Sequence, residues 1–133
     1  MIALLIVGIL AAIAYPSYVE YITRAHRTDG QSALMDLATR MERYYSEKNT
    51  YQTATIASAN ATDVLSSSTS PEGWYTLSIT NATGSAYTIR ATPRTTQATR
   101  DTRCQTLTLT SVGAKGITAG PAGVPTGTVA QCW

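Results

Sequence analysis

The first fourteen residues, Met1 to Ala14, are apolar apart from Gly8, and Pro16 follows closely. As an α-helix this run would extend about 21 Å, whereas crossing a hydrocarbon core of about 30 Å takes about 20 apolar residues. Continuing to Val19 gives about 28 Å but includes Pro16. The run therefore fits three roles: a membrane anchor, a signal peptide, or a helix buried against other protein.

The signal-peptide interpretation rests on the tripeptide at Ala12 to Ala14, which resembles an A-x-A cleavage site, but no basic region precedes the apolar run. Beyond Pro16 the apolar residues recur at helical spacing, as at Tyr18 and Ile22. We therefore favour a single helix that lies in a bilayer in the monomer and packs against copies of itself in an assembly.

Helical spacing continues through the residues that form an apolar stripe: Leu34, Leu37, Met41, Tyr44 and Tyr45. The pattern predicts helix from about Ser17 to Glu47, with a weak point near Gly30 because glycine lowers helix stability. The polar segment Thr23–Ser32 need not touch the core of the domain. His26, which lies in this segment, is expected to be solvated.

A Ser/Thr/Asn-rich stretch after the helix shows no periodicity and predicts a long surface loop. Alternating apolar and polar residues then predict three strands, over Trp74–Ile79, Ala86–Ala91 and Cys104–Ser111. The sequence thus predicts an α+β fold, in which a long N-terminal helix packs on a three- to four-stranded antiparallel sheet.

The two cysteines, Cys104 and Cys132, enclose a segment rich in glycine and proline: Gly113, Gly116, Gly120, Pro121, Gly123, Pro125 and Gly127. Such a segment buries little apolar surface, and a disulfide across it would contribute about 3–4 kcal/mol. We predict that disulfide and an oxidising compartment, with two free thiols as the alternative.

Four arginines and one aspartate lie within fourteen residues, in a stretch that we call the arginine segment, Arg90–Arg103. It is the best candidate in the chain for binding anions or the phosphates of DNA, through Arg90, Arg94, Arg100 and Arg103. The alternative is a solvated face that balances acids on neighbouring subunits. The segment contains no aromatic residue that could stack on bases.

Catalytic chemistry has little support in the sequence. His26 is the only histidine, and we find no metal-ligand spacing and no glycine-rich phosphate loop. We therefore predict no catalytic residue, no metal site and no cofactor.

Several stretches resemble one known family. "MIALLIVGILAAIAYPSYVEYITRA" resembles the conserved N-terminal helix of type IV pilins. The stretches "SALMDLATRMERYYSEKNTY" and "DTRCQTLTLTSVGAKG" and the closing "CW" resemble the pilE-like minor pilin group. The resemblance implies a long helix, residues 1–47 with 1–19 apolar, and a globular head, residues 48–133, that contains a disulfide-bounded C-terminal region.

The resemblance also implies a function: a structural subunit that polymerises into a surface filament for adhesion, motility or DNA uptake. The implied partners are copies of itself, the inner membrane before assembly, the pilus assembly machinery and, as a further option, DNA. The subunit would leave the bacterial inner membrane for the extracellular pilus, with its head in the oxidising periplasm or outside. The alternatives are a minor pilin that primes filaments or acts as a competence DNA receptor, and a pseudopilin of type II secretion.

Within such a filament, the packing residues of the core are expected to be Met1, Ile2, Leu4, Leu5, Ile6, Val7, Ile9, Leu10 and Ile13. Regular helix is expected to be lost between Gly8 and Pro16, where helical bonding is weakest. Family members carry, just before the position of Met1, a Phe exposed by prepilin peptidase and a Glu that helps to dock a new subunit. Neither is in this sequence, and such residues would lengthen the apolar run enough to span a bilayer.

Overall fold

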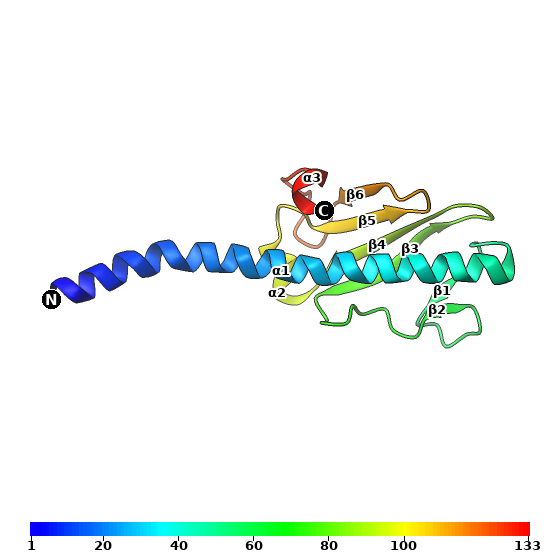
Figure 1. The fold of residues 1–133 in the computed structure, drawn as a ribbon, viewed down its shortest axis with the longest axis horizontal. Helices are drawn as coiled ribbons and strands as arrows, with labels where there is room; N and C mark the ends of the chain where they lie inside the picture. Colours follow the sequence, from blue (N-terminus) through cyan, green and yellow to red (C-terminus); the bar gives the residue numbers. More distant parts are fainter.

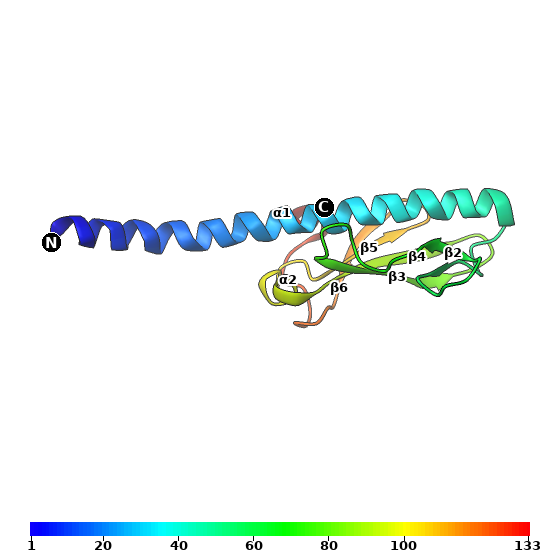
Figure 2. The ribbon, with the colours of Figure 1, turned by 90° about the horizontal axis from the view of Figure 1, so that it is seen from below.

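The computed structural model describes all residues from Met1 to Trp133, and its longest element is the helix α1, Ile2–Lys48. The first half of α1 projects away from the head, and the second half lies along one face of a sheet (Figures 1 and 2). In this single subunit the helix runs through Gly8 and Pro16 without a break. The loss of helix there concerns the filament and stays a prediction.

Four antiparallel strands form the sheet, in the order β3 (Tyr75–Ala82), β4 (Tyr87–Pro93), β5 (Thr106–Thr110) and β6 (Lys115–Thr118). Alternate residues of β4 face the helix, as its buried and half-buried positions show. This arrangement confirms the predicted fold class.

The core lies between α1 and the sheet. Its fully buried side chains include three from the predicted apolar stripe and three from the strands: Leu34, Leu37, Met41, Tyr75, Ile89 and Leu107. The helix ends just beyond this stripe at Asn49, which adopts a left-handed conformation with φ 56° and donates its N–H to the Tyr45 carbonyl.

The loop predicted after α1 and the arginine segment each contain short elements. The loop after α1 holds a small parallel pair, β1 (Thr55–Ile56) and β2 (Asp63–Leu65), and the arginine segment contains a six-residue helix, α2 (Thr95–Arg100). A last helix, α3 (Val129–Cys132), ends the chain. Each element is too short to give a periodic signal in the sequence.

The predicted weak point near Gly30 is wrong. The helix is regular there, and the glycine instead lets the ring of Tyr75 lie directly on the helix backbone. A Cβ atom at position 30 would come within 2.9 Å of that ring, which is fully buried and has no room to move. Gly30 therefore serves close packing of the helix on β3.

The polar segment, which by its composition need not touch the core, does enter the interior of the head, because Thr23, Arg27 and Asp29 are all buried. The carboxylate of Asp29 accepts hydrogen bonds from the Ser70 hydroxyl at 2.5 Å and from the backbone N–H of Glu72 at 3.1 Å. Loop groups that enter the interior need such partners. The polar side chains of α1 thus hold the loops of the head.

His26 is half-buried and not solvated as expected. Its ring stacks on Trp74, with 3.7 Å between the ring centroids, and its Nδ1 lies 3.3 Å from the side-chain oxygen of Gln97. The histidine therefore joins α1 to both the start of β3 and α2.

Candidate functional site

Arg90 is separated from the other arginines of its segment. It lies in the middle of β4 on the face of the sheet away from α1, between Ser78 of β3 and Thr108 of β5. Its side chain is half-buried, and its Nε is buried without a hydrogen-bond partner. This position makes Arg90 a weaker candidate for contact with a large anionic partner.

Three other arginines surround α2 and are exposed. Arg94 precedes the helix, Arg100 is its last residue, and Arg103 lies in the turn before β5. Arg94 donates to the Thr69 hydroxyl at 3.1 Å, while Arg103 lies 3.8 Å from the Glu20 carboxylate. Exposed contacts of this kind are weak, so they leave the guanidinium groups available to a ligand.

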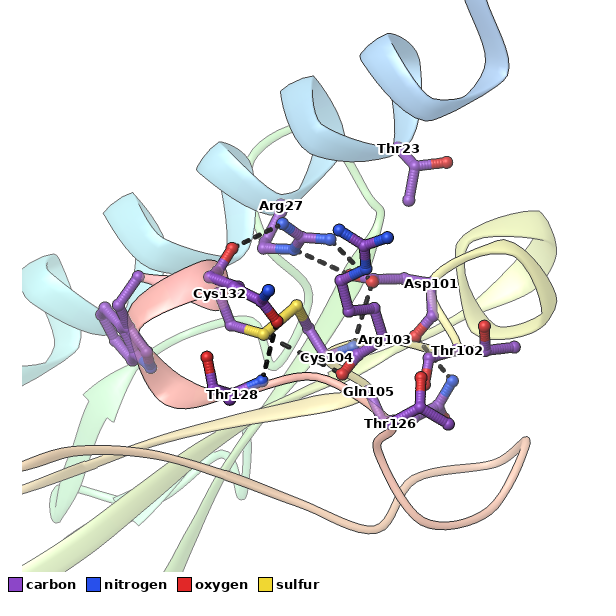
Figure 3. The surroundings of a disulfide bond; sticks show 12 residues. Thr23, Arg27, Asp101, Thr102, Arg103, Cys104, Gln105, Thr126, Thr128 and Cys132 are labelled. Carbon is purple, nitrogen blue, oxygen red and sulfur yellow. Dashed lines mark hydrogen bonds and ion pairs between the residues drawn. A yellow bond between two sulfur atoms is a disulfide. The ribbon is translucent and has the colours of Figure 1, made fainter. Parts of the chain in front are cut away.

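The one acid of the arginine segment, Asp101, points into the protein and not towards these arginines. Its carboxylate accepts two hydrogen bonds from Arg27 of α1, from Nη2 at 2.8 Å and from Nε at 3.0 Å (Figure 3). The carboxylate is completely buried and the guanidinium almost so. This two-point pairing has the geometry of the strong arginine–carboxylate interactions.

Three further donors complete the environment of Asp101. The N–H of Cys104 lies 3.2 Å from the carboxylate, and the Tyr75 hydroxyl and the Gln97 amide each lie 3.4 Å from it. Burial raises the pKa of the Tyr75 phenol above its usual range, so it remains a donor. The negative charge of Asp101 is therefore neutralised by groups in the interior of the protein.

The buried pair of Arg27 and Asp101 determines the charge of the surface around α2. Because Arg27 neutralises Asp101 in the interior, Arg94, Arg100 and Arg103 are exposed without an acid from their own segment. The surface is therefore more positive than the sequence of the segment alone indicates. A group of exposed arginines attracts the phosphates of nucleic acids.

The disulfide lies next to this site. Cys104 and Cys132 are bonded, with 5.6 Å between their Cα atoms, and both are buried (Figure 3). Two side chains of α1 also hold the end of the chain: Gln31 donates to the Cys132 carbonyl at 2.8 Å, and Arg27 to the Gln131 carbonyl at 3.4 Å. The tail is therefore attached to α1 as well as through the disulfide.

A cavity of about 420 Å³ lies where α1 meets the end of α2. One wall is a stripe of α1 from Tyr15 to Arg27, and the other is the turn from Arg100 to Arg103. Four arginines line it, namely Arg24, Arg27, Arg100 and Arg103. We call it the arginine-lined cavity.

Comparison with known families identifies the chain. Residues 16–108 match the family described as "Type IV minor pilin ComP, DNA uptake sequence receptor". The chain belongs to this family. It is thus a type IV minor pilin, a structural subunit of the pilus.

The fold of this minor pilin is also similar to a solved structure, that of the non-core minor pilin PilV of Neisseria meningitidis, with a TM-score of 0.55 and 19% sequence identity. The alignment covers 80% of this chain and 97% of the other. At this identity the likeness concerns the fold, and it supports the arrangement of a long helix on an antiparallel sheet.

Sequence reasoning missed the residues that hold the site together, above all Arg27 and Gln97. Gln97 is fully buried and donates to the Thr23 carbonyl at 3.0 Å and to the Tyr75 hydroxyl at 3.1 Å. Arg27 looks in the sequence like any surface residue of a helix. The one available signal was the single acid among four arginines, which could have suggested a partner elsewhere.

Proposed function

We propose that this minor pilin is a DNA receptor of the pilus, and that Arg94, Arg100 and Arg103 contact the phosphates of duplex DNA. The observation that carries the proposal is the burial of Asp101 against Arg27, which leaves these three arginines exposed around α2. The family description names DNA uptake sequence receptors, which adds support from relatives. Contacts to phosphate would supply affinity without reading sequence.

We also propose that α1 gives the subunit two successive environments, the inner membrane before assembly and the pilus core afterwards. By length and composition, α1 is the one helix in the chain able to cross a membrane. Its nine large apolar residues between Met1 and Ile13 are at least half exposed in the single subunit. So large an apolar surface requires lipid or neighbouring helices to cover it.

In this account the head remains in the periplasm and later outside the cell. The disulfide between Cys104 and Cys132 supports an oxidising compartment. The arginines around α2 belong to the head, so incorporation into the pilus would carry them out to extracellular DNA. The minor pilin would thus combine a structural role in the filament with capture of DNA.

The DNA proposal is tested by anisotropy titrations of a labelled duplex with the full chain in a mild detergent. We expect binding that weakens steeply as salt rises. The double variant Arg94→Ala/Arg100→Ala is expected to bind roughly tenfold more weakly at about 50 mM salt, and to flatten the slope of log K against log salt by about 1.8.

The matched control is Arg40→Ala/Arg43→Ala, which removes two exposed arginines from the other end of the same molecule. This variant is expected to bind DNA as the wild type does. Absence of wild-type binding at low salt, or equal losses in the two double variants, would contradict the proposed interface.

A further inference from the structure

We propose that the arginine-lined cavity binds the headgroup phosphate of an anionic phospholipid while the subunit resides in the inner membrane. This inference rests on the membrane residence proposed above, and its site shares Arg100 and Arg103 with the surface proposed for DNA. The lipid would fix the height and orientation of the head above the bilayer before the subunit enters the filament.

The position of the cavity along α1 is the first argument. The first charged residue of the chain is Glu20, and three tyrosines cluster at the same level: Tyr15, Tyr18 and Tyr21, which are 69%, 62% and 72% exposed. Exposed tyrosines at the end of an apolar helix are typical of the membrane–water interface. The α1 wall of the cavity runs from Tyr15 to Arg27, so the cavity opens at the level of the headgroups.

The charge of the cavity is the second argument. Its acids are Glu20 and Asp101, and Asp101 is already paired with Arg27 in the interior. Arg24 and Arg103 lie 3.1 Å and 3.8 Å from Glu20, with all three side chains more than half exposed. Exposed pairs are weak, and one carboxylate faces two guanidinium groups, so a phosphate would find unneutralised positive charge.

The lining favours a lipid over DNA as the occupant. Next to the arginines the wall contains Tyr15, Pro16 and Val19, apolar surface suited to the glycerol and first methylenes of a lipid. A volume of about 420 Å³ fits a small headgroup and not a duplex. While the subunit is in the membrane, a duplex reaching Tyr15 would meet the bilayer surface, whereas the headgroups of the periplasmic leaflet would already lie there.

Native mass spectrometry of the full chain tests this inference. The chain is released from detergent micelles that contain equal amounts of phosphatidylglycerol and phosphatidylcholine with the same acyl chains. We expect the wild type to retain phosphatidylglycerol over phosphatidylcholine by roughly tenfold, and Arg24→Gln/Arg103→Gln to retain both equally. Far-UV circular dichroism and the intact-disulfide mass verify that the variant is folded.

The matched control is Arg40→Gln/Arg43→Gln. It also removes two exposed arginines, both from α1. One of them, Arg40, is in an i,i+4 pair with Asp36, as Arg24 is with Glu20. This variant is expected to keep the full preference. Equal retention of both lipids by the wild type, or an equal loss of preference in the two double variants, would overturn the inference.

Two further outcomes distinguish lipid binding from the proposals of DNA binding and membrane residence. If Arg24→Gln/Arg103→Gln loses DNA binding but keeps its preference for phosphatidylglycerol, the cavity serves DNA and the lipid inference is wrong. If the wild type retains neither lipid, the lipid inference is wrong, while the proposals of membrane residence and DNA binding are untouched. The DNA test changes Arg94 and Arg100 and measures binding of a duplex, whereas the lipid test changes Arg24 and Arg103 and measures retention of a lipid, so the two proposals can fail separately.

Discussion

Asp101→Ala is expected to lower the free energy of unfolding by about 3–5 kcal/mol, because it leaves the guanidinium of Arg27 buried without a countercharge. The substitution also removes the acceptor for the backbone N–H of Cys104. Urea denaturation of the full chain in detergent, followed by tryptophan fluorescence, measures the effect. Trp74 is a suitable probe because it stacks on His26, the residue directly before Arg27 in α1.

Asp36→Ala provides the comparison, because it breaks an exposed i,i+4 pair with Arg40 whose N–O distance is 2.9 Å. Its cost is expected to be about 0.5 kcal/mol or less. Replacing both buried partners, as in Arg27→Met/Asp101→Leu, is expected to recover most of the stability lost in Asp101→Ala. Similar small effects for Asp36→Ala and Asp101→Ala would show that the buried pair does not hold α2 on α1.

Removing the disulfide has the second largest expected effect. Cys104→Ser/Cys132→Ser is expected to cost about 3–4 kcal/mol, because the bond closes a loop across a sequence separation of 28 residues. The loss of protection from hydrogen exchange is expected to be local, with faster exchange in residues 113–132. Protection at Leu34 to Met41 should persist, since that part of the core lies between α1 and the sheet.

Peptide-resolved hydrogen exchange of the wild type and the double serine variant compares protection in the tail with protection in the core. Reducing the disulfide of the wild type gives a second form of the protein without this bond, and it is expected to show the same pattern. Because Cys104 is fully buried in the core, the two serines also replace buried sulfur atoms. Uniform loss of protection across α1 and the sheet would show that the tail is part of the folding unit and not a segment attached to it.

The parts of the fold that rest on apolar periodicity could be predicted from the sequence. Leu34, Leu37 and Met41 mark one face of a helix, and the alternation around Ile89 and Leu107 marks strands. Each pattern involves residues close together in the chain, so it can be recognised from the sequence alone. The very short pieces, such as α2 and the pair of β1 and β2, fall below the length at which a period can be recognised.

The polar segment of α1 could not be predicted in the same way. At helical spacing Arg27 and Asp29 look like a solvated face, and only distant residues make them buried. The partner of Arg27 is Asp101, 74 residues away, and the partner of Asp29 is Ser70, 41 residues away. Contacts between residues so far apart depend on the whole topology.

The same reason explains the outcome for the arginine segment. In the sequence Asp101 lies directly after Arg100, and nothing local shows which positive charge it neutralises. In the structure its carboxylate is fully buried against α1, and the neighbouring arginines remain exposed. The exposed positive surface proposed to bind DNA thus depends on the inward orientation of one acid, Asp101.

Hydrogen exchange of the full chain with and without a duplex DNA fragment at low salt tests the DNA interface most directly. The account predicts added protection in residues 94–103, with none in the hairpin turn 82–87 or in the distal part of α1 from 39 to 48. Protection confined to either of those regions, or to the loop 119–127, with residues 94–103 unchanged, would contradict it.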